Sequence, residues 1–454
     1  MRPALAAFDE TIAALATGAG RNALAVVRVS GRAASEVLTR IAPSLASPPP
    51  PRQARLAAVV DPQGETIDRA VLTFFPGPAS ATGEDVLEIS LHGGPAVVRR
   101  ALDAVTAAGA RLARPGEFTE RAFLLGRIDL LEAEAVRDLI DARTPEALRA
   151  SARRLDGALS RELGEIREEL ARAAAELAAT IDFAEDVGES VAPETVERVG
   201  RAADALDRLA ASAERGRLLA EGARVVFLGP PNAGKSTLFN ALAGTARAIV
   251  TEIPGTTRDT LDAAIDVEGV PVEIVDTAGL RETGDEVERL GVARARAAAA
   301  DGDAILYVFD AARGFTPEDE NALREIAADG GRTLVMANKI DVAPDAAVPP
   351  GALPLCGLAP GAGTTLRAGI SSLLDLGPPP EAMSRLLGSA RQRDLARRAA
   401  AAARDAHRGL SAGESPEYPA ARLDEGLAAM ADLFGETTPE DVLRAIFSTF
   451  CIGK

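Results

Sequence analysis

Lysine is almost missing from this sequence: of its 50 basic residues only three are lysine, namely Lys235, Lys339 and Lys454. A position that keeps lysine against such an arginine-rich background is therefore a first place to look for function. Aromatic residues are also scarce, at 3% with no tryptophan. Together with the abundant alanine, this favours helices packed through small side chains over a β-sandwich or a β-barrel.

Several protein classes are excluded by what else is missing. The two cysteines, Cys356 and Cys451, cannot form the disulfide framework of a secreted protein, and two histidines are too few for a histidine-rich metal site. No uncharged apolar run reaches the roughly 18 residues of a membrane span, and no basic segment followed by an apolar run begins the chain. We therefore expect a cytoplasmic protein without a membrane segment. The net charge of −17 argues against general nucleic-acid binding.

The 454 residues suggest two to four domains, at roughly 100–200 residues per domain. Up to about residue 91, short apolar strands alternate with turns, as in Ala23–Val29, Ala70–Phe75 and Asp85–Leu91. A helix follows from Pro95. This first part of the chain is predicted to be a small α+β domain, residues 1–118.

Helical periodicity dominates the stretches Leu130–Ala142, Pro145–Ile181 and Val196–Leu219, and it returns after Pro378–Pro380. Between them, short apolar strands alternate with partly helical segments, as in a doubly wound α/β domain. The strands are Val225–Leu228, Val272–Asp276, Ile305–Asp310 and Leu334–Ala337. We therefore expect a multidomain protein in which an α/β domain (221–377) is inserted into a helical domain (119–220 and 378–454).

The first strand of the α/β segment leads into a phosphate-binding sequence. Residues 229–236, Gly-Pro-Pro-Asn-Ala-Gly-Lys-Ser, match the pattern GxxxxGK[ST] between a strand and a helix. In such a loop the backbone N–H groups surround phosphate oxygens, Lys235 reaches the β- and γ-phosphates, and the Ser236 hydroxyl coordinates Mg²⁺. The alternative, a chance glycine-rich turn, is disfavoured by the strand–loop–helix context.

Two later strand ends predict that the nucleotide is GTP. One ends in Asp276-Thr277-Ala278-Gly279, where the aspartate can reach Mg²⁺ through water and the glycine N–H can bind a γ-phosphate. Another ends in Asn338-Lys339-Ile340-Asp341, where a carboxylate can accept two N–H bonds from guanine. Adenine offers no such pair of donors. By itself the second motif would be an ordinary turn, but in this order the motifs indicate guanine selection.

The loop Thr251–Asp259 is a candidate switch, because a hydroxyl such as that of Thr257 can complete the Mg²⁺ shell only while a γ-phosphate is present. The residue after Gly279 is Leu280, whereas Ras-like enzymes place there a glutamine that orients water. Either hydrolysis is negligible or another group orients the water. Acidic candidates that the residues alone do not separate are Glu282, Asp285, Glu286 and Glu288.

Distinctive segments also lie outside the nucleotide motifs. They are VVRVSG (26–31), FPGP (75–78), TGEDVLE (82–88), HGGP (92–95), ARPGEFTERAF (113–123), IDLL (128–131), IDF (181–183) and FCIGK (450–454). With these segments and the nucleotide motifs, the chain resembles, over essentially its full length, the MnmE (TrmE) family of bacterial tRNA-modification GTPases, which is related to the Era-like GTPases.

The resemblance implies an N-terminal domain that binds a tetrahydrofolate derivative (a 5-formyl or methylene form) and mediates a homodimer. It also implies a partner, the flavoprotein MnmG (GidA), which alone carries FAD and forms a heterotetramer-type complex. Together such proteins install a (carboxymethyl)aminomethyl-type group on the wobble uridine, U34, of certain tRNAs. The folate contacts of the family fall on Arg28, Glu88, Arg127 and Lys454. At the position of Arg127 many relatives have lysine, which keeps the charge but changes the donor geometry.

The family also implies a K⁺ ion beside the phosphates that takes the place of an arginine finger. Its ligands align with Asn232, Thr251, the Ile253 carbonyl and Thr256, and the water-orienting carboxylate aligns with Glu288. Cys451 is a candidate catalytic thiol, with a small buried hydrophobe as the alternative. The full set of expected GTP contacts is Asn232, Ala233, Gly234, Lys235, Ser236, Thr237, Thr251, Glu252, Ile253, Pro254, Gly255, Thr256, Thr257, Asp276, Thr277, Ala278, Gly279, Asn338, Lys339, Ile340 and Asp341.

Three positions depart from the family pattern. Gly20-Arg21-Asn22-Ala23 replaces a glycine-rich GRGG, Leu125 stands where relatives usually have asparagine, and the guanine-backing motif is Leu355-Cys356-Gly357. The last change predicts weaker nucleotide binding unless backbone N–H contacts survive. The alternative function is an Era-like GTPase that acts as a binding switch in ribosome assembly or signalling, without modification chemistry.

Overall fold

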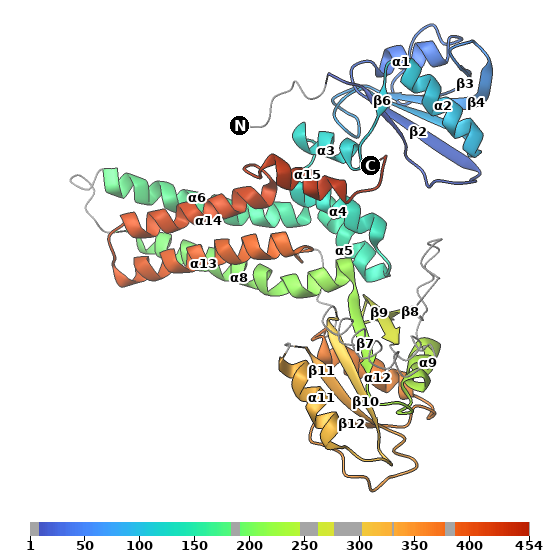
Figure 1. The fold of residues 1–454 in the computed structure, drawn as a ribbon. Helices are drawn as coiled ribbons and strands as arrows, with labels where there is room; N and C mark the ends of the chain where they lie inside the picture. Colours follow the sequence, from blue (N-terminus) through green and yellow to red (C-terminus); the bar gives the residue numbers. More distant parts are fainter. Residues whose placement is uncertain are drawn as a thin grey trace. The chain divides into compact units, whose positions relative to one another are not determined.

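The computed structural model describes residues 9–182, 191–245, 262–276, 302–328, 331–376 and 386–453. The chain forms two compact units, each assembled from segments that are distant in sequence. Unit 1 contains Met1–Arg137, Leu155–Ala203 and Arg398–Lys454, and unit 2 contains Asp138–Arg154 and Asp204–Arg397. The architecture confirms the expected fold class, with an N-terminal α+β domain, a helical domain and an inserted α/β domain (Figure 1).

The N-terminal sheet of unit 1 has the strand order β3-β4-β5-β2-β1-β6. Its strands are β1 (Ile12–Leu15), β2 (Leu24–Ser30), β3 (Ala54–Val60), β4 (Thr66–Phe75), β5 (Val86–His92) and β6 (Arg111–Leu112). Neighbouring strands are antiparallel except β1 and β6, which are parallel. Helices α1 (Ala34–Ile41) and α2 (Pro95–Ala107) share one apolar core with this sheet.

Side chains of a strand alternate between the two faces of its sheet. On β2, Val27 and Val29 belong to the core under α1 and α2, so Leu24, Arg28 and Ser30 lie on the opposite face. Part of that face packs against α3 (Glu117–Leu124), where Phe118 is buried against Ile12 and Ala14. The expected strands and helix of this region are thus observed, with their ends shifted by at most four residues.

The helices of unit 1 come from both sides of the α/β insertion. Helix α6 (Ala158–Asp182) lies along α14 (Glu417–Phe434), as expected for a helical domain split by an insertion (Figure 1). The buried side chains of α6 recur every three or four residues and form one apolar stripe. They are Leu159, Leu163, Ile166, Leu170, Ala173 and Leu177.

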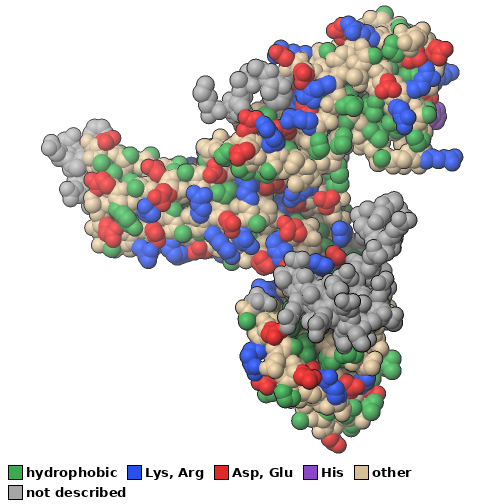
Figure 2. Space-filling model, in the orientation of Figure 1, with side chains coloured by type: hydrophobic (Ala, Val, Ile, Leu, Met, Phe, Trp, Pro, Cys, Tyr) green, Lys and Arg blue, Asp and Glu red, His purple; other side chains and the backbone are tan. Residues whose placement is uncertain are grey.

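Further helices are α4 (Leu130–Asp141), α5 (Pro145–Leu155), α8 (Pro193–Glu221), α13 (Ala390–Ala412) and α15 (Glu440–Ser448). The predicted helical stretch Pro145–Ile181 is divided into α5 and α6, because Gly157 takes a φ of +76° that a continuing helix does not allow. In Figure 2, arginine and acidic side chains are interspersed over the visible face of the helices. No helix in the described ranges combines the length and apolar character needed to cross a membrane.

The α/β sheet of unit 2 has the strand order β12-β11-β10-β7-β9-β8. Its strands are β7 (Ala223–Leu228), β8 (Asp262–Val267), β9 (Val270–Asp276), β10 (Ala304–Asp310), β11 (Thr333–Asn338) and β12 (Leu353–Leu355). All neighbours are parallel except the edge hairpin β8–β9. The helices are α9 (Lys235–Thr245), α11 (Pro317–Ala328) and α12 (Ala362–Leu373).

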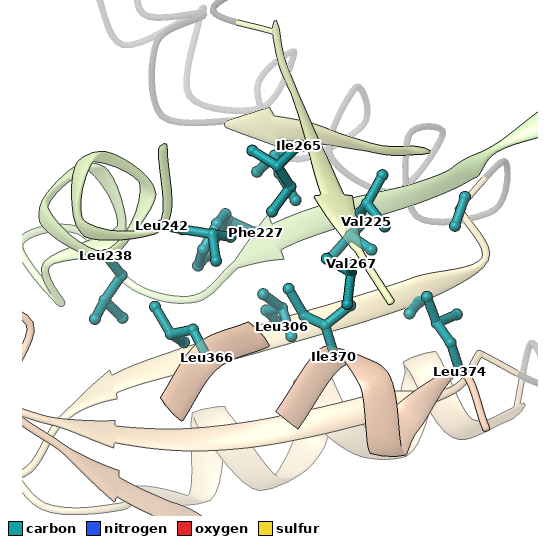
Figure 3. Packing of buried hydrophobic residues seen from close by; sticks show 14 of the residues in the cluster. Val225, Phe227, Leu238, Leu242, Ile265, Val267, Leu306, Leu366, Ile370 and Leu374 are labelled. Atoms are coloured by element: carbon teal, nitrogen blue, oxygen red, sulfur yellow. The ribbon is translucent and has the colours of Figure 1, made fainter. Parts of the chain in front are cut away.

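The core of the α/β sheet is apolar and contains side chains from both strands and helices. Phe227 of β7 and Leu306 of β10 lie among Leu238 of α9 and Leu366 and Ile370 of α12 (Figure 3). Because α9 is anchored in this core, the loop that precedes it is held at the carboxyl end of β7. That edge of a parallel sheet is where nucleotide sites are usually formed.

Helix α5 also belongs to unit 2, where its first turn contacts the hairpin β8–β9. The Thr144 hydroxyl donates to the Gly269 carbonyl at 2.5 Å and accepts the N–H of Ala147 at 3.1 Å. Thr144 therefore caps α5 and satisfies a buried carbonyl of the hairpin turn at the same time.

Candidate functional site

The loop between β7 and α9 has the backbone shape of a phosphate cradle. Gly229, Asn232 and Gly234 have φ values of +131°, +62° and +94°. A Cβ on Gly229 would lie 1.9 Å from the Val308 carbonyl oxygen, so a side chain is excluded there. The buried amine of Lys235 donates to the carbonyl oxygens of Gly229 and Pro230, both at 2.8 Å. The loop and its lysine therefore fit a nucleotide phosphate.

Asn338 joins the two nucleotide motifs to each other. Its Nδ2 donates to the Ala233 carbonyl in the phosphate loop at 2.9 Å, and its Oδ1 accepts the N–H of Gly357 at 3.0 Å. The side chain is buried, so both bonds are shielded from water. A Cβ on Gly234 would lie 2.2 Å from Asn338 Nδ2, which explains the second glycine of the phosphate loop.

Lys339 holds the same two segments together by a different route. Its Nζ donates to the Asn232 carbonyl at 2.8 Å and to Oδ2 of Asp310 at 2.7 Å. Burial works to raise the pKa of Asp310, but the bonds from Lys339 and the Ala312 N–H outweigh it and leave that pKa below the ordinary value. Sequence reasoning missed Asp310. Its position directly at the end of the apolar strand β10 was the available signal.

Two of the departures from the family pattern have a local explanation. The N–H of Gly357 donates to Asn338, and a Cβ at this position would lie 2.8 Å from Leu238 Cδ2, so a larger residue would require the end of that leucine side chain to shift. The backbone N–H of Asn22 donates to the Gly93 carbonyl (3.0 Å) and its side chain donates to the Gly18 carbonyl (2.9 Å), so the altered turn is still ordered.

The remaining nucleotide residues are only partly described. Ser236 and Asp341 are exposed, Thr237 is half-buried, and the Ile340 N–H donates to the Leu355 carbonyl at 3.3 Å. The backbone of Asp276 pairs with Phe227 beside the phosphate loop. The predicted site residues outside the described residues are Thr251, Glu252, Ile253, Pro254, Gly255, Thr256, Thr257, Thr277, Ala278, Gly279, Glu288 and Lys454.

In the N-terminal domain, two of the predicted folate residues are in direct contact. Arg28 of β2 lies opposite Glu88 of β5 and donates to its Oε1 from Nε at 3.0 Å and from Nη2 at 2.8 Å. The guanidinium carbon of Arg28 is 5.9 Å from the centre of the Phe118 ring of α3. The two side chains are 20% and 29% exposed, so a ligand can reach the pair.

Arg127 and the C-terminal tail approach the same domain. A Cβ on Gly83 would lie 3.0 Å from Cγ of the exposed Arg127, so the loop containing Gly83 packs against this side chain. A Cβ on Gly453 would lie 2.3 Å from the carbonyl oxygen of Leu15, the residue paired with Val27 of β2. Gly453 thus lies beside the strand pair that carries Arg28.

Cys451 is exposed, so the alternative of a buried small hydrophobe is wrong. Its carbonyl accepts the N–H of Gly116 at 3.4 Å, which holds this part of the tail at the start of α3. The thiol is accessible, and a catalytic role for it stays a prediction.

The largely parallel sheet, the glycine-turned phosphate loop and the Asn338–Asp341 turn define a P-loop GTPase domain. A family model described as GTP-binding protein TrmE N-terminus matches residues 11–127, and one described as MnmE helical domain matches residues 130–451. The chain therefore belongs to the MnmE family.

Relatives named tRNA modification GTPase MnmE match over nearly the whole chain. The protein of Roseiflexus sp. (strain RS-1) is 46% identical and that of Aquifex aeolicus 38% identical, each covering 98% of this chain and 100% of the relative. A solved structure of Aquifex aeolicus Era bound to GDP and AlF₄⁻ is 28% identical, with a TM-score of 0.27, and covers 35% of this chain and 58% of Era. The full-length relatives favour the MnmE hypothesis over the Era-like alternative.

Proposed function

We propose that this protein is a cytoplasmic GTPase whose hydrolysis supports modification of U34 in certain tRNAs, together with the FAD-dependent protein MnmG (GidA). Family membership over the full chain, combined with the ordered junction of the phosphate loop and the Asn338–Asp341 turn, carries this proposal. The modification is of the 5-(carboxymethyl)aminomethyl type.

Each predicted residue of the nucleotide site has a proposed task. The loop N–H groups and Lys235 bind and orient the phosphates, and the Asp341 carboxylate accepts the two N–H donors of guanine. Glu288 orients the attacking water, since Leu280 cannot. Ser236 and Thr257 would hold a Mg²⁺ ion, which would supply positive charge to neutralise the phosphates. A K⁺ ion held by Asn232, Thr251, Ile253 and Thr256 would add a fixed positive charge there.

The predicted folate residues Arg28, Glu88, Arg127 and Lys454, here called the N-terminal cluster, carry the charged groups that a one-carbon tetrahydrofolate requires. A carboxylate such as Glu88 can accept the neighbouring N–H donors of the pterin ring, and Arg127 and Lys454 can pair with the anionic glutamate tail. Around the cluster, the sheet face opposite α1 and α2 exposes apolar side chains, namely Leu24, Leu56 and Val71. We place the homodimer contact on this face.

The potassium part of the proposal is tested by measuring GTP hydrolysis in K⁺ and in Na⁺, with wild type, Glu288→Ala and the neighbouring control Glu286→Ala. We expect fast hydrolysis only in K⁺, a large loss for Glu288→Ala and little change for the control. Equal wild-type rates in the two salts would refute the potassium dependence.

The tRNA part is tested by nucleoside analysis of tRNA from a strain that lacks the protein. Hypomodified U34 should appear, and it should be corrected by wild type but not by Lys235→Met. Unchanged nucleosides in the deletion strain would refute the modification role. Co-purification of the chain with the flavoprotein, or its failure, tests the partner separately.

A further inference from the structure

Arg121 of α3 is the largest of the fully buried side chains among the described residues. Its Nη1 donates to the two carboxylate oxygens of Glu84 at 3.2 and 2.9 Å. Its Nη2 donates to Oε1 of Glu117 at 3.2 Å and to the Glu10 carbonyl at 2.9 Å. The guanidinium thus connects two carboxylates, and the two connections lead to different parts of the domain.

The Glu84 connection leads toward the predicted folate residues. Oε2 of Glu84 accepts the Ser30 hydroxyl at 2.8 Å, and Ser30 also shares a hydrogen bond of 2.7 Å with Thr82. Ser30 lies two residues after Arg28, so both side chains are on the same face of β2. Arg121 is therefore linked through one carboxylate to the strand that carries Arg28.

The same connection fixes the loop Ser80–Glu84. The Gly83 N–H donates to the Ser80 hydroxyl at 2.9 Å, and the Glu84 N–H donates to the Thr82 hydroxyl at 3.3 Å. Gly83, with a φ of +91°, is the residue that packs against Arg127. Holding Glu84 in place therefore holds the backbone surface on which Arg127 rests.

The Glu117 connection leads away from these residues. Glu117 accepts two bonds from Arg111, at 2.8 and 2.6 Å, and the backbone N–H of Arg114 at 2.8 Å. These partners lie on β6 and in the turn before α3, at the far edge of the sheet from β3. Glu117 is therefore a second carboxylate on the same arginine with an anchoring role, and within the described part of the chain its hydrogen bonds go to Arg111, Arg114 and Arg121 rather than to Arg28, Glu88 or Arg127.

We propose that Arg121 and Glu84 are positioning residues for the folate site: the buried pair holds β2 and the loop Ser80–Glu84 in the arrangement that sets Arg28 and Arg127 for the ligand. The inference rests on the proposed folate function. A buried ion pair is often no more stabilising than apolar residues of the same size. A fixed hydrogen-bonded geometry, in contrast, decides how well nearby ligand-binding groups are oriented.

The two carboxylates allow a matched experiment. Glu84→Gln and Glu117→Gln each replace one of the two carboxylates that accept bonds from the buried Arg121 with a neutral amide. Binding of 5-formyltetrahydrofolate to the full-length protein is measured by titration calorimetry, and the melting temperature is recorded for each variant. We expect Glu84→Gln to weaken folate binding about tenfold. Glu117→Gln should bind the folate like wild type, although it should lower the melting temperature by at least as much as Glu84→Gln does.

Two further variants separate positioning from folding. Ser30→Ala removes the link from Glu84 to β2 without removing a charge, and it should weaken binding about threefold with little effect on melting. Arg121→Lys keeps a cation that can reach Glu84 and should recover most of the affinity that Arg121→Met loses. If Arg121→Met does not fold, Ser30→Ala and the two glutamine variants still decide the question.

The positioning role would be overturned if Glu84→Gln bound the folate with wild-type affinity. It would also be overturned if both glutamine variants lost affinity in proportion to the drop in their melting temperatures. In either case the folate proposal itself would stand. A wild-type protein that does not bind the folate would refute the folate proposal, and this inference with it. The two failures are distinguished by the wild-type titration.

Discussion

The nucleotide site and the N-terminal cluster are built in contrasting ways. The nucleotide site is formed mainly by one contiguous loop, residues 229–235, whose backbone conformation makes the cradle, with Asn338 and Lys339 tying a second turn to it. The N-terminal cluster and the residues that position it are joined by ion pairs between side chains far apart in sequence, such as Arg28 with Glu88 in the cluster and Arg121 with Glu84 beside it.

This difference has a consequence for mutations. In the nucleotide site, Lys235 donates to loop carbonyl groups and Asp341 is exposed, and we expect that either side chain can be removed with little effect on folding. In the N-terminal cluster, each buried charge is also part of the packing, so removing one partner leaves the other uncompensated. Function and stability should therefore be separable in unit 2 and coupled in unit 1.

The largest expected effect is that of Lys235→Met. Loss of a preorganised charge at the phosphates should lower GTP hydrolysis about 10²–10³-fold, while the melting temperature stays close to that of wild type. Hydrolysis assays and thermal unfolding of the same preparation measure both quantities. Arg324→Met is the control, because it removes an exposed cation of α11 that lies outside the nucleotide motifs. A marked loss of stability in Lys235→Met would break the proposed separation.

A pH-dependent stability should be found in unit 1. Burial works to raise the pKa of Glu117, but bonds from Arg111 and the Arg114 N–H dominate and lower that pKa from 4.5 to about 2. The carboxylate thus stabilises the folded state above pH 4.5, by about 3 kcal/mol, and this contribution is lost as the pH falls toward 2.

Denaturant unfolding of wild type and Glu117→Gln at several pH values between 7 and 2 measures this contribution. The difference in unfolding free energy should be largest at neutral pH and should disappear at the acid end. A difference that does not change with pH would mean that the charge of Glu117 is not what stabilises unit 1.

The contrast also explains how much could be predicted from the sequence. The phosphate loop and the Asn338–Asp341 turn were recognised because the required residues are adjacent and each motif follows an apolar strand. The bonds of Asn338 to Ala233 and Gly357 join segments that meet only when β7, β11 and β12 align in the sheet. No spacing rule places them together.

The N-terminal cluster was accessible only through resemblance. Glu84 and Arg121 both lie in recognised segments, yet 37 positions separate them, and nothing in either segment indicates that the two charges pair. The pairing depends on α3 packing against the face of the sheet that carries Arg28 and Ser30. The division of the predicted helical stretch at Gly157 was likewise missed, because a single glycine within a periodic pattern does not necessarily end a helix.

A smaller effect is expected for Asp341→Asn. This variant should change the base specificity of the nucleotide site without changing the stability of unit 2, which would sharpen the contrast with unit 1. An amide cannot accept both N–H donors of guanine, so GTP binding should weaken about 10–100-fold. Xanthosine triphosphate, which presents an oxygen in place of the amino group, should bind better to the variant than to wild type. Competition binding with the two nucleotides measures the change. Asp345→Asn, at another exposed position of the same loop, is the control and should keep the preference for GTP.

The smallest effect tests whether a side chain outside the nucleotide loop contributes to the stability of unit 2. Thr144→Val keeps the shape of the side chain but removes the bond to the buried Gly269 carbonyl and the cap of α5. It should destabilise unit 2 by about 1 kcal/mol. The unfolding transition of unit 2 is identified as the one that shifts when GDP is added, since a ligand stabilises the unit that binds it. Thr39→Val, which removes only a local bond to the Glu36 carbonyl in unit 1, should have no such effect. If Thr144→Val leaves this transition unchanged, α5 does not stabilise the hairpin β8–β9, and the contrast between the two units is sharper than the contacts suggest.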